Sequence, residues 1–263
     1  MEKLYGVTVV VVGFFASLLA GLMTGVGALP VLFGQSISQR MSDVFLGFAA
    51  GVMLAASFFS LILPGIETAR GIHGSDTAAA AVAVGGVLVG AAVMAALNEW
   101  VPHEHFFQGR QGPQAEALAR IWLFVLAITL HNAPEGLAVG VGFGGGDMAA
   151  GTALAIGIGL QNAPEGLAVA VALLSCGYSK SRSFAVAGLT GLVEPVTGFL
   201  GAYAVSLSLH VLPWALTSAA GAMIFVISHE IIPDTHRHGF EKEATLGLIF
   251  GLVAMMFLDL AIR

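Results

Sequence analysis

The chain has 263 residues, of which 57% are hydrophobic and only 10% are charged. With a mean hydropathy of +0.90, it has too few polar residues to cover a water-soluble globule of this size. The net charge of -6 leaves no basic patch for nucleic acid, and the single cysteine, Cys176, excludes an internal disulfide or a zinc–thiolate cluster. The composition predicts a protein whose solvent is the lipid bilayer.

A membrane-spanning helix needs roughly 20 mostly apolar residues, because its backbone must satisfy its own hydrogen bonds in hydrocarbon. The sequence contains eight such stretches, joined by short connections: Tyr5–Phe33, Asp43–Pro64, Thr77–Leu97, Ile121–Phe143, Ala149–Ser175, Ser183–Leu209, Pro213–Pro233 and Glu243–Ile262. We therefore expect an all-α membrane protein with eight transmembrane helices, forming a single domain over residues 1–263.

The basic residues predict the orientation of these helices. Lys and Arg concentrate in cytoplasmic loops. The connections after the first, third, fifth and seventh stretches hold Arg40, Arg110, Arg120, Lys180, Arg182, Arg237 and Lys242, whereas the opposite side holds Lys3, Arg70 and Arg263. This bias places both termini on the extracytoplasmic side.

Pairs of glycines four residues apart occur in the first three stretches. Small residues at this spacing let membrane helices approach closely. We interpret them as packing contacts, on faces that also allow a homodimer; the pairs are Gly21 with Gly25, Gly47 with Gly51, and Gly86 with Gly90.

An internal repeat links the fourth and fifth stretches. HNAPEGLAVG begins at His131, and QNAPEGLAVA begins thirty residues later at Gln161. Consecutive spanning helices run in opposite directions, so the two copies lie at similar depth on antiparallel helices, as in transporters built from inverted repeats. The sequence predicts two half-sites that face each other near the middle of the membrane.

Each copy places donor side chains on one face of its helix, since residues four apart are neighbours there. The donors are His131, Asn132 and Glu135 in the first copy and Gln161, Asn162 and Glu165 in the second. Prolines at 134 and 164 remove a backbone donor beside them. The sixth stretch adds Glu194, followed by Pro195.

No Lys or Arg within the predicted spans can neutralise these three glutamates. A charged side chain at the bilayer centre costs about 2.5 to 3.5 kcal/mol on insertion scales. Protons or bound cations must therefore balance the charge of the glutamates. The alternative to a metal site is that the glutamates are protonated packing residues and that His131 is a neutral bridge between helices. Imidazole, carboxylate and amide donors without thiolates suit divalent ions such as Zn(II), Fe(II), Mn(II), Co(II) or Cd(II).

The consecutive motifs HNAPEG, QNAPEG and EP resemble those of the ZIP (Zrt/Irt-like) family of metal transporters, and most closely its GufA-like bacterial branch. MLAASFFSLILPG in the second stretch and SHEIIPDTHRHG in the seventh extend the resemblance. It implies a two-metal site with Glu135 and Glu165 bridging and Met53 as a soft accessory ligand. The ligands implied are His131, Asn132, Glu135, Gln161, Asn162, Glu165 and Glu194; many family members have His at the position of Gln161.

Further donors lie toward both ends of the predicted bundle. Glu67 and Asp259 are expected near the outer ends of their helices, where negative charge attracts cations. At the opposite end, His229 and Glu230 are the stronger candidates for passing metal onward, in a group with Asp234, His236 and His238. A loop pair, His103 and His105, is a further candidate, although such histidines are usually solvated.

These features predict a transporter of divalent metals, zinc above all, into the cytoplasm across a bacterial inner membrane. The metal is the substrate, and no catalytic cofactor is expected. We expect alternating access, with the second, fourth and fifth helices moving as a unit. An intramembrane metal-dependent hydrolase is less consistent because the sequence has no HExxH motif; a selective metal-ion channel remains open.

Overall fold

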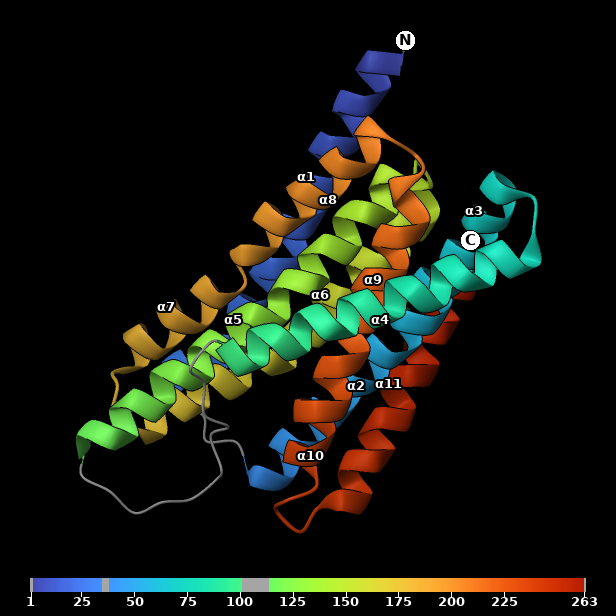
Figure 1. The fold of residues 1–263 in the computed structure, drawn as a ribbon. Helices are drawn as coiled ribbons and strands as arrows, with labels where there is room; N and C mark the ends of the chain where they lie inside the picture. The colour runs from blue at the N-terminus through green and yellow to red at the C-terminus, as the bar shows by residue number, and fades with distance from the viewer. Residues whose placement is uncertain (1, 35–37, 101–113, 263) are drawn as a thin grey trace.

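The computed structural model describes residues 2–34, 38–100 and 114–262, and within these ranges every regular element is a helix. Figure 1 shows these helices arranged as one elongated bundle. The α-helices are α1 (Glu2–Ala28), α2 (Gln39–Ala55), α3 (Leu63–His73), α4 (Asp76–Trp100), α5 (Gln114–Gly144), α6 (Met148–Ser175), α7 (Lys180–Thr190), α8 (Val193–Leu207), α9 (Val211–Val226), α10 (Ile232–Thr235) and α11 (Glu241–Ile262). Three shorter segments are the 3₁₀ helix η1 (Leu29–Phe33) and the π-helices η2 (Ala56–Ile62) and η3 (Ile227–Ile231).

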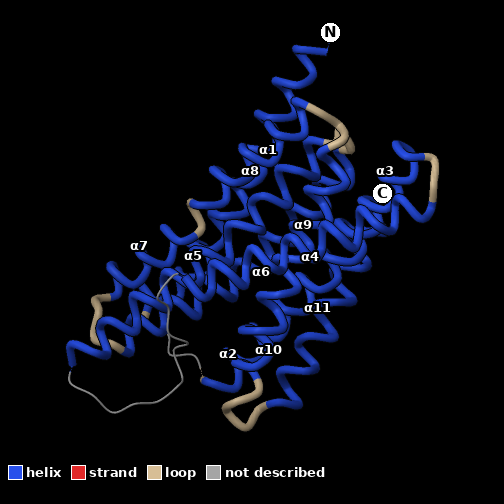
Figure 2. Tube along the Cα trace, in the orientation of Figure 1, coloured by secondary structure: helices blue, strands red, loops and turns tan. Residues whose placement is uncertain are grey.

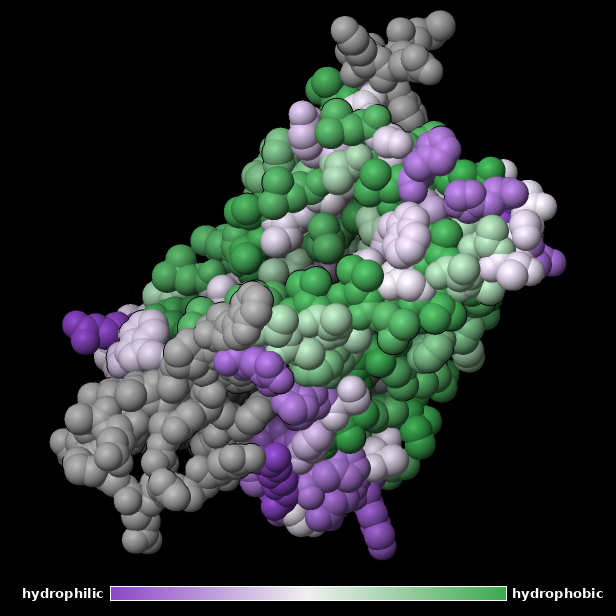
Figure 3. All heavy atoms as spheres, viewed as in Figure 1, coloured by the Kyte–Doolittle hydropathy of each residue, from purple (hydrophilic) through white to green (hydrophobic). Residues whose placement is uncertain are grey.

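Seven stretches of the described residues are long and apolar enough to cross a membrane. They are Gly6–Phe33, Gln39–His73, Asp76–Glu99, Met148–Ser175, Lys180–Leu207, Val211–Thr235 and Glu241–Ile262. The predicted fourth span lies within α5, which is not among the seven. Hydrophobic residues cover much of the lateral surface in Figure 3, while hydrophilic ones gather toward the ends. The chain is therefore a multi-pass membrane protein, and the eighth span stays a prediction.

The second and seventh spans each contain a π-helical segment just before a proline. η2 precedes Pro64 and η3 precedes Pro233. A proline within a helix lacks its N–H and crowds the carbonyl four residues earlier, here that of Ser60 or His229. The backbone accommodates this by widening to a π-helix, a feature common at functional sites. The expected end of the second span at Pro64 is wrong, because the helix continues to His73.

The sixth span is broken rather than continuous. α7 ends at Thr190 and α8 begins at Val193, with a turn at Gly191 and Leu192. The same physical cause applies, since Pro195 cannot bond to the carbonyl of Gly191. This break puts Glu194 in the first turn of α8, where the helix dipole favours negative charge.

The helices pack as two groups (Figures 1 and 2). In the first group, α5 lies against α8 and α6 against α1; in the second, α2 lies against α11 and α4 against α9. The main partner of α2 is α11, although α2 also contacts α6; the movement of the second, fourth and fifth helices as a unit stays a prediction. Both labelled termini lie toward the end of the bundle that holds α3, away from α10 (Figure 1).

The glycine pairs are confirmed as helix-packing contacts within this chain. Gly47 and Gly51 of α2 lie against the backbone of α11, where no Cβ could be accommodated. Gly21 and Gly25 likewise face α7 and its end, and Gly86 and Gly90 face α9. Since these faces are already occupied, they offer no surface for a second copy of the chain.

Candidate metal-binding site

The two copies of the repeat lie side by side in the middle of the bundle. α5 and α6 contact each other and are joined by a short turn, so they run antiparallel as predicted. All six donors are buried: His131 is 4% exposed, Glu165 is 2% exposed, and Asn132, Glu135, Gln161 and Asn162 are fully buried. The expectation that the repeat brings its donors into the interior is met.

Glycines of the motifs bring the helices close beside the glutamates. Gly136, next to Glu135, lies against the backbone of Glu194, and Gly166, next to Glu165, lies against the backbone of Thr24 in α1. A Cβ at either position would overlap backbone atoms of the neighbouring helix. The glycine of each NAPEG motif therefore sets how near α5 comes to α8 and α6 to α1.

The three predicted glutamates come together. Glu135 lies within electrostatic reach of both Glu165 and Glu194, and Glu165 also interacts with His131. Glu194 is fully buried at the start of α8. Carboxylates from three helices are thus buried within electrostatic reach of one another, and their mutual repulsion favours binding of cations or protons.

Amide side chains connect the second half-site to Glu194. The Asn162 side-chain amide donates to Glu194 Oε1 at 2.8 Å and to the carbonyl of Ala20 at 2.9 Å. Gln161 Nε2 donates to Asn162 Oδ1 at 2.8 Å. These bonds hold α6, α8 and α1 together and fix one oxygen of the Glu194 carboxylate.

His131 reaches across to the other group of helices. Its Nε2 lies 2.8 Å from Glu230 Oε2, and both side chains are nearly buried. The sequence places Glu230 beside His229 in a group at the end of the seventh span, but the structure separates them. His229 is exposed, contacts Asn98 Nδ2 at 3.2 Å and stacks on Phe225. Glu230 therefore joins the interior donors, and His229 does not.

We call the eight interior donors the central site: His131, Asn132, Glu135, Gln161, Asn162, Glu165, Glu194 and Glu230. Many of its polar atoms have no hydrogen-bond partner among the described residues. These are both oxygens of Glu135 and Glu165, both side-chain amide atoms of Asn132, Gln161 Oε1 and Glu194 Oε2. Buried polar atoms are nearly always paired, so this concentration marks a place for a ligand.

The donors approach one another without forming a closed coordination sphere. Among the residues with described side chains, no three or more His, Cys, Asp or Glu side chains are grouped closely enough to hold a metal ion. Instead they form pairs, His131 with Glu230 and Glu194 with Asn162. Met53 is fully buried in the apolar cluster that also contains Ala138 and Ile158; its part as a ligand stays a prediction.

The two acids predicted at the outer end differ in their surroundings. Asp259 is 2% exposed, and its Oδ1 accepts a hydrogen bond from Ser60 in η2 at 2.8 Å. Glu67 is exposed and lines an open cavity of about 330 Å³ together with Ser60 and Asp147. Of these two acids, only Glu67 is exposed; its place at the outer end stays a prediction.

The remaining predicted donors lie at the opposite end. His236 Nδ1 contacts the carbonyl of Ile232 at 2.9 Å, whereas His238 Nδ1 lies 3.1 Å from Asp43 Oδ1. No sequence pattern pairs His238 with Asp43, since 195 residues separate them. His103 and His105 lie outside the described residues.

Comparison with known proteins identifies the family. The family model described as "ZIP Zinc transporter" matches residues 101–259. The chain is 47% identical over 251 residues to "Zinc transporter GufA" of Myxococcus xanthus, covering 95% of this chain and 98% of that protein. It is 50% identical over 239 residues to "Zinc transporter ZIPB" of Bordetella bronchiseptica (91% and 77%), and 34% identical over 321 residues to human "Zinc transporter ZIP11" (91% and 94%).

The motifs of the repeat, the family model and the relatives matched over more than nine tenths of the chain all agree. The chain belongs to the ZIP zinc transporter family.

Proposed function

We propose that this protein carries divalent transition-metal ions, zinc foremost, across the membrane into the cytoplasm through the central site. The observation that carries the proposal is the burial of Glu135, Glu165 and Glu194 within electrostatic reach of one another. Five of their six carboxylate oxygens form no hydrogen bond of normal geometry among the described residues. A divalent cation satisfies such oxygens and balances their charge at once.

The donor set supports zinc and its neighbours as substrates. One imidazole, several carboxylates and amide groups, without a thiolate, favour borderline divalent ions over Cu(I). Relatives that share 34 to 50% identity are named zinc transporters; iron, manganese, cobalt and cadmium are further candidate substrates. In this proposal Glu135 and Glu165 bridge two ions, and Met53 is an accessory ligand.

The pairing of His131 with Glu230 suggests how an ion leaves the central site. A metal bound to His131 Nε2 must displace Glu230, whose carboxylate is then an oxygen donor close to the ion. Because Glu230 belongs to the second group of helices, this step moves the ion from one group to the other. Glu230 is thus both competitor and acceptor for the same ion.

Eight spans with both termini outside complete the proposed topology, with α5 as the additional span. The distribution of Lys and Arg supports this orientation, and an even number of passes agrees with termini at one end of the bundle (Figure 1). We place the protein in a bacterial inner membrane, as a single domain over residues 1–263. A homodimer would need a lipid-facing surface other than the glycine faces.

Alternating access is the mechanism we favour, since a site between two groups of helices can open to either side when they shift. The group containing α1, α5, α6, α7 and α8 would move against the rest. A metal-ion channel would pass ions without such movement, and a hydrolase would use a glutamate as base on metal-bound water.

Uptake into proteoliposomes tests the proposal. Sealed vesicles containing the protein should accumulate Zn(II) with saturable kinetics, and Glu135→Ala, Glu165→Ala or Glu194→Ala should abolish accumulation. Glu241→Ala, which removes an exposed acid at the start of α11, is the matched control and should transport normally. Failure of the wild-type protein to accumulate metal would refute transport; flux that does not saturate would favour a channel.

A further inference from the structure

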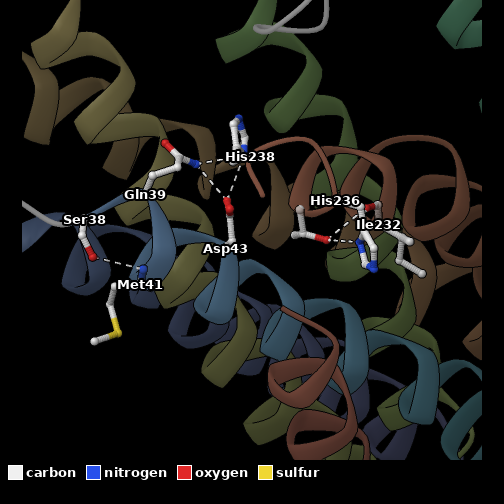
Figure 4. Close-up of polar contacts among 8 residues, drawn as sticks. Ser38, Gln39, Met41, Asp43, Ile232, His236 and His238 are labelled. Atoms are coloured by element: carbon white, nitrogen blue, oxygen red, sulfur yellow. Dashed lines mark hydrogen bonds and ion pairs between the residues drawn. The ribbon is translucent and has the colours of Figure 1, made fainter. Parts of the chain in front are cut away.

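A second group of donors lies at the end of the bundle where α2 begins. Asp43, one turn into α2, accepts a hydrogen bond at Oδ1 from Gln39 Nε2 at 2.8 Å and contacts His238 Nδ1 at 3.1 Å. His238 belongs to the turn between α10 and α11. Figure 4 shows the three side chains converging on one point, with His236 turned toward a different partner. We call Gln39, Asp43 and His238 the inner cluster.

The inner cluster has donors suited to a divalent ion. Two ligand atoms bound to a tetrahedral zinc lie about 3.3 Å apart, given metal–ligand bonds of about 2.0 to 2.1 Å. The 3.1 Å between His238 Nδ1 and Asp43 Oδ1 is close to that separation. Gln39 Nε2 also lies 3.1 Å from His238 Nδ1, and rotation of its amide group would present an oxygen instead.

Asp43 gives a second, independent indication of a ligand. Its side chain is fully buried, and its Oδ2 has no hydrogen-bond partner among the described residues. A buried carboxylate oxygen without a donor is costly. A salt link between helices alone would use Oδ1 and leave this cost uncompensated, whereas a metal ion bound by the carboxylate removes it.

Acidic residues connect the inner cluster to the central site. Glu230, Asp234 and His238 follow one another at intervals of four residues along η3, α10 and the turn after it. Glu230 contacts His131, and Asp234 interacts electrostatically with Glu230, His238 and Asp43. Gln39 also borders a small cavity of about 40 Å³ between α2 and α6 that reaches Pro164 of the second motif.

We propose that Asp43 and His238, assisted by Gln39, form a divalent-metal site that receives the ion from Glu230 and releases it to the cytoplasm. Water completes the coordination. The role in release rests on the proposed function, but metal binding by the inner cluster does not.

Binding is tested with Co(II), whose visible absorption reports its coordination, on the full-length protein in detergent. The protein carries Glu135→Ala, Glu165→Ala and Glu194→Ala, so that the central site loses three of its four carboxylates. We expect one bound Co(II), with affinity at least about tenfold weaker after His238→Ala. His236→Ala is the matched control, two residues away and bonded to a backbone carbonyl, and should bind Co(II) as before.

If the triple variant fails to fold, His238→Ala and His236→Ala are instead compared in the otherwise unaltered protein. There His238→Ala should lower the bound Co(II) by one equivalent, and His236→Ala should not. Co(II) binding that is insensitive to His238→Ala in every folded background, or equally sensitive to His236→Ala, overturns the proposal and leaves a structural link between α2 and the α10–α11 turn.

Transport kinetics test the release step separately. His238→Ala should lower the maximal rate of Zn(II) uptake severalfold while the KM for external Zn(II) changes less than about twofold, because uptake from outside does not involve the inner cluster. An unchanged maximal rate would refute the role in release. If the wild-type protein transports no metal, the proposed function fails, yet Co(II) binding by the inner cluster remains measurable.

Discussion

Replacing Gly136 by alanine should damage the central site without removing any donor from it. The added Cβ would overlap the backbone of Glu194 and approach Thr197 Oγ1, well inside the 3.0 Å limit that real Cβ contacts respect. Because backbone cannot swing aside as a side chain can, α5 and α8 must separate by roughly 1 Å to restore normal contact. That movement shifts Glu135 away from Glu194.

The magnitude follows from two opposing effects. Overpacking against backbone costs about 3 kcal/mol, at the upper end of the usual range, while alanine in place of glycine within a helix offsets about 1 kcal/mol. The net loss of about 2 kcal/mol should lower the Tm by about 4 to 8 °C for a chain of this size. Transport should fall more steeply than stability, since ligand positions matter within a fraction of an ångström.

Gly142→Ala on the same helix is the control. Its Cβ would meet Leu154 Cδ2 at 3.4 Å and Gly151 Cα at 3.5 Å, which are ordinary contacts, so the Tm should stay the same or rise. Thermal unfolding in detergent and Zn(II) uptake in proteoliposomes measure the two effects. A Gly136→Ala protein with the stability and uptake of wild type would show that the close approach of α5 to α8 does not shape the site.

Three further outcomes are expected. Metal affinity should weaken from pH 8 to pH 5, by about tenfold per pH unit for each proton that the ion displaces from the glutamates; a calorimetric titration showing constant affinity would contradict this. Glu230→Gln should keep the protein folded but slow uptake severalfold, because an amide accepts a cation from His131 less readily than a carboxylate; uptake at the normal rate would exclude Glu230 from the path. Ser60→Ala removes the hydrogen bond to Asp259 and should destabilise the protein by about 1 to 3 kcal/mol, whereas Ser228→Ala, at an exposed position, should change the Tm little.

The sequence predicts most of the spanning helices and the burial of the repeat's donors on neighbouring helices, because both depend on local patterns. Apolar length identifies the spans, and the NAPEG repeat places Glu135 and Glu165 on facing helices. The burial of Glu194 also follows, since an acid next to a proline lies in an apolar stretch. These features need no knowledge of how distant segments pack.

Features that depend on backbone irregularity or distant contacts escape sequence reasoning. A π-helix adds a residue to the turn, so the register after residue 227 shifts, and Glu230 turns inward while His229 faces outward. A proline in the sequence is equally consistent with the end of a helix and with a local distortion. At Pro64 the helix continues through a π-helical segment, whereas before Pro195 it breaks. The pairing of Asp43 with His238 has no local signal at all.

The length of α6 has a consequence for how far an ion must travel. Gln161 and Asn162 lie at the midpoint of its 28 residues, so the central site is about 20 Å along the helix axis from either end at 1.5 Å per residue. No side chain reaches that far. On the proposed path, an ion would therefore cross each half in several hops between successive oxygen and nitrogen atoms, and the slowest hop would set the rate of the whole passage.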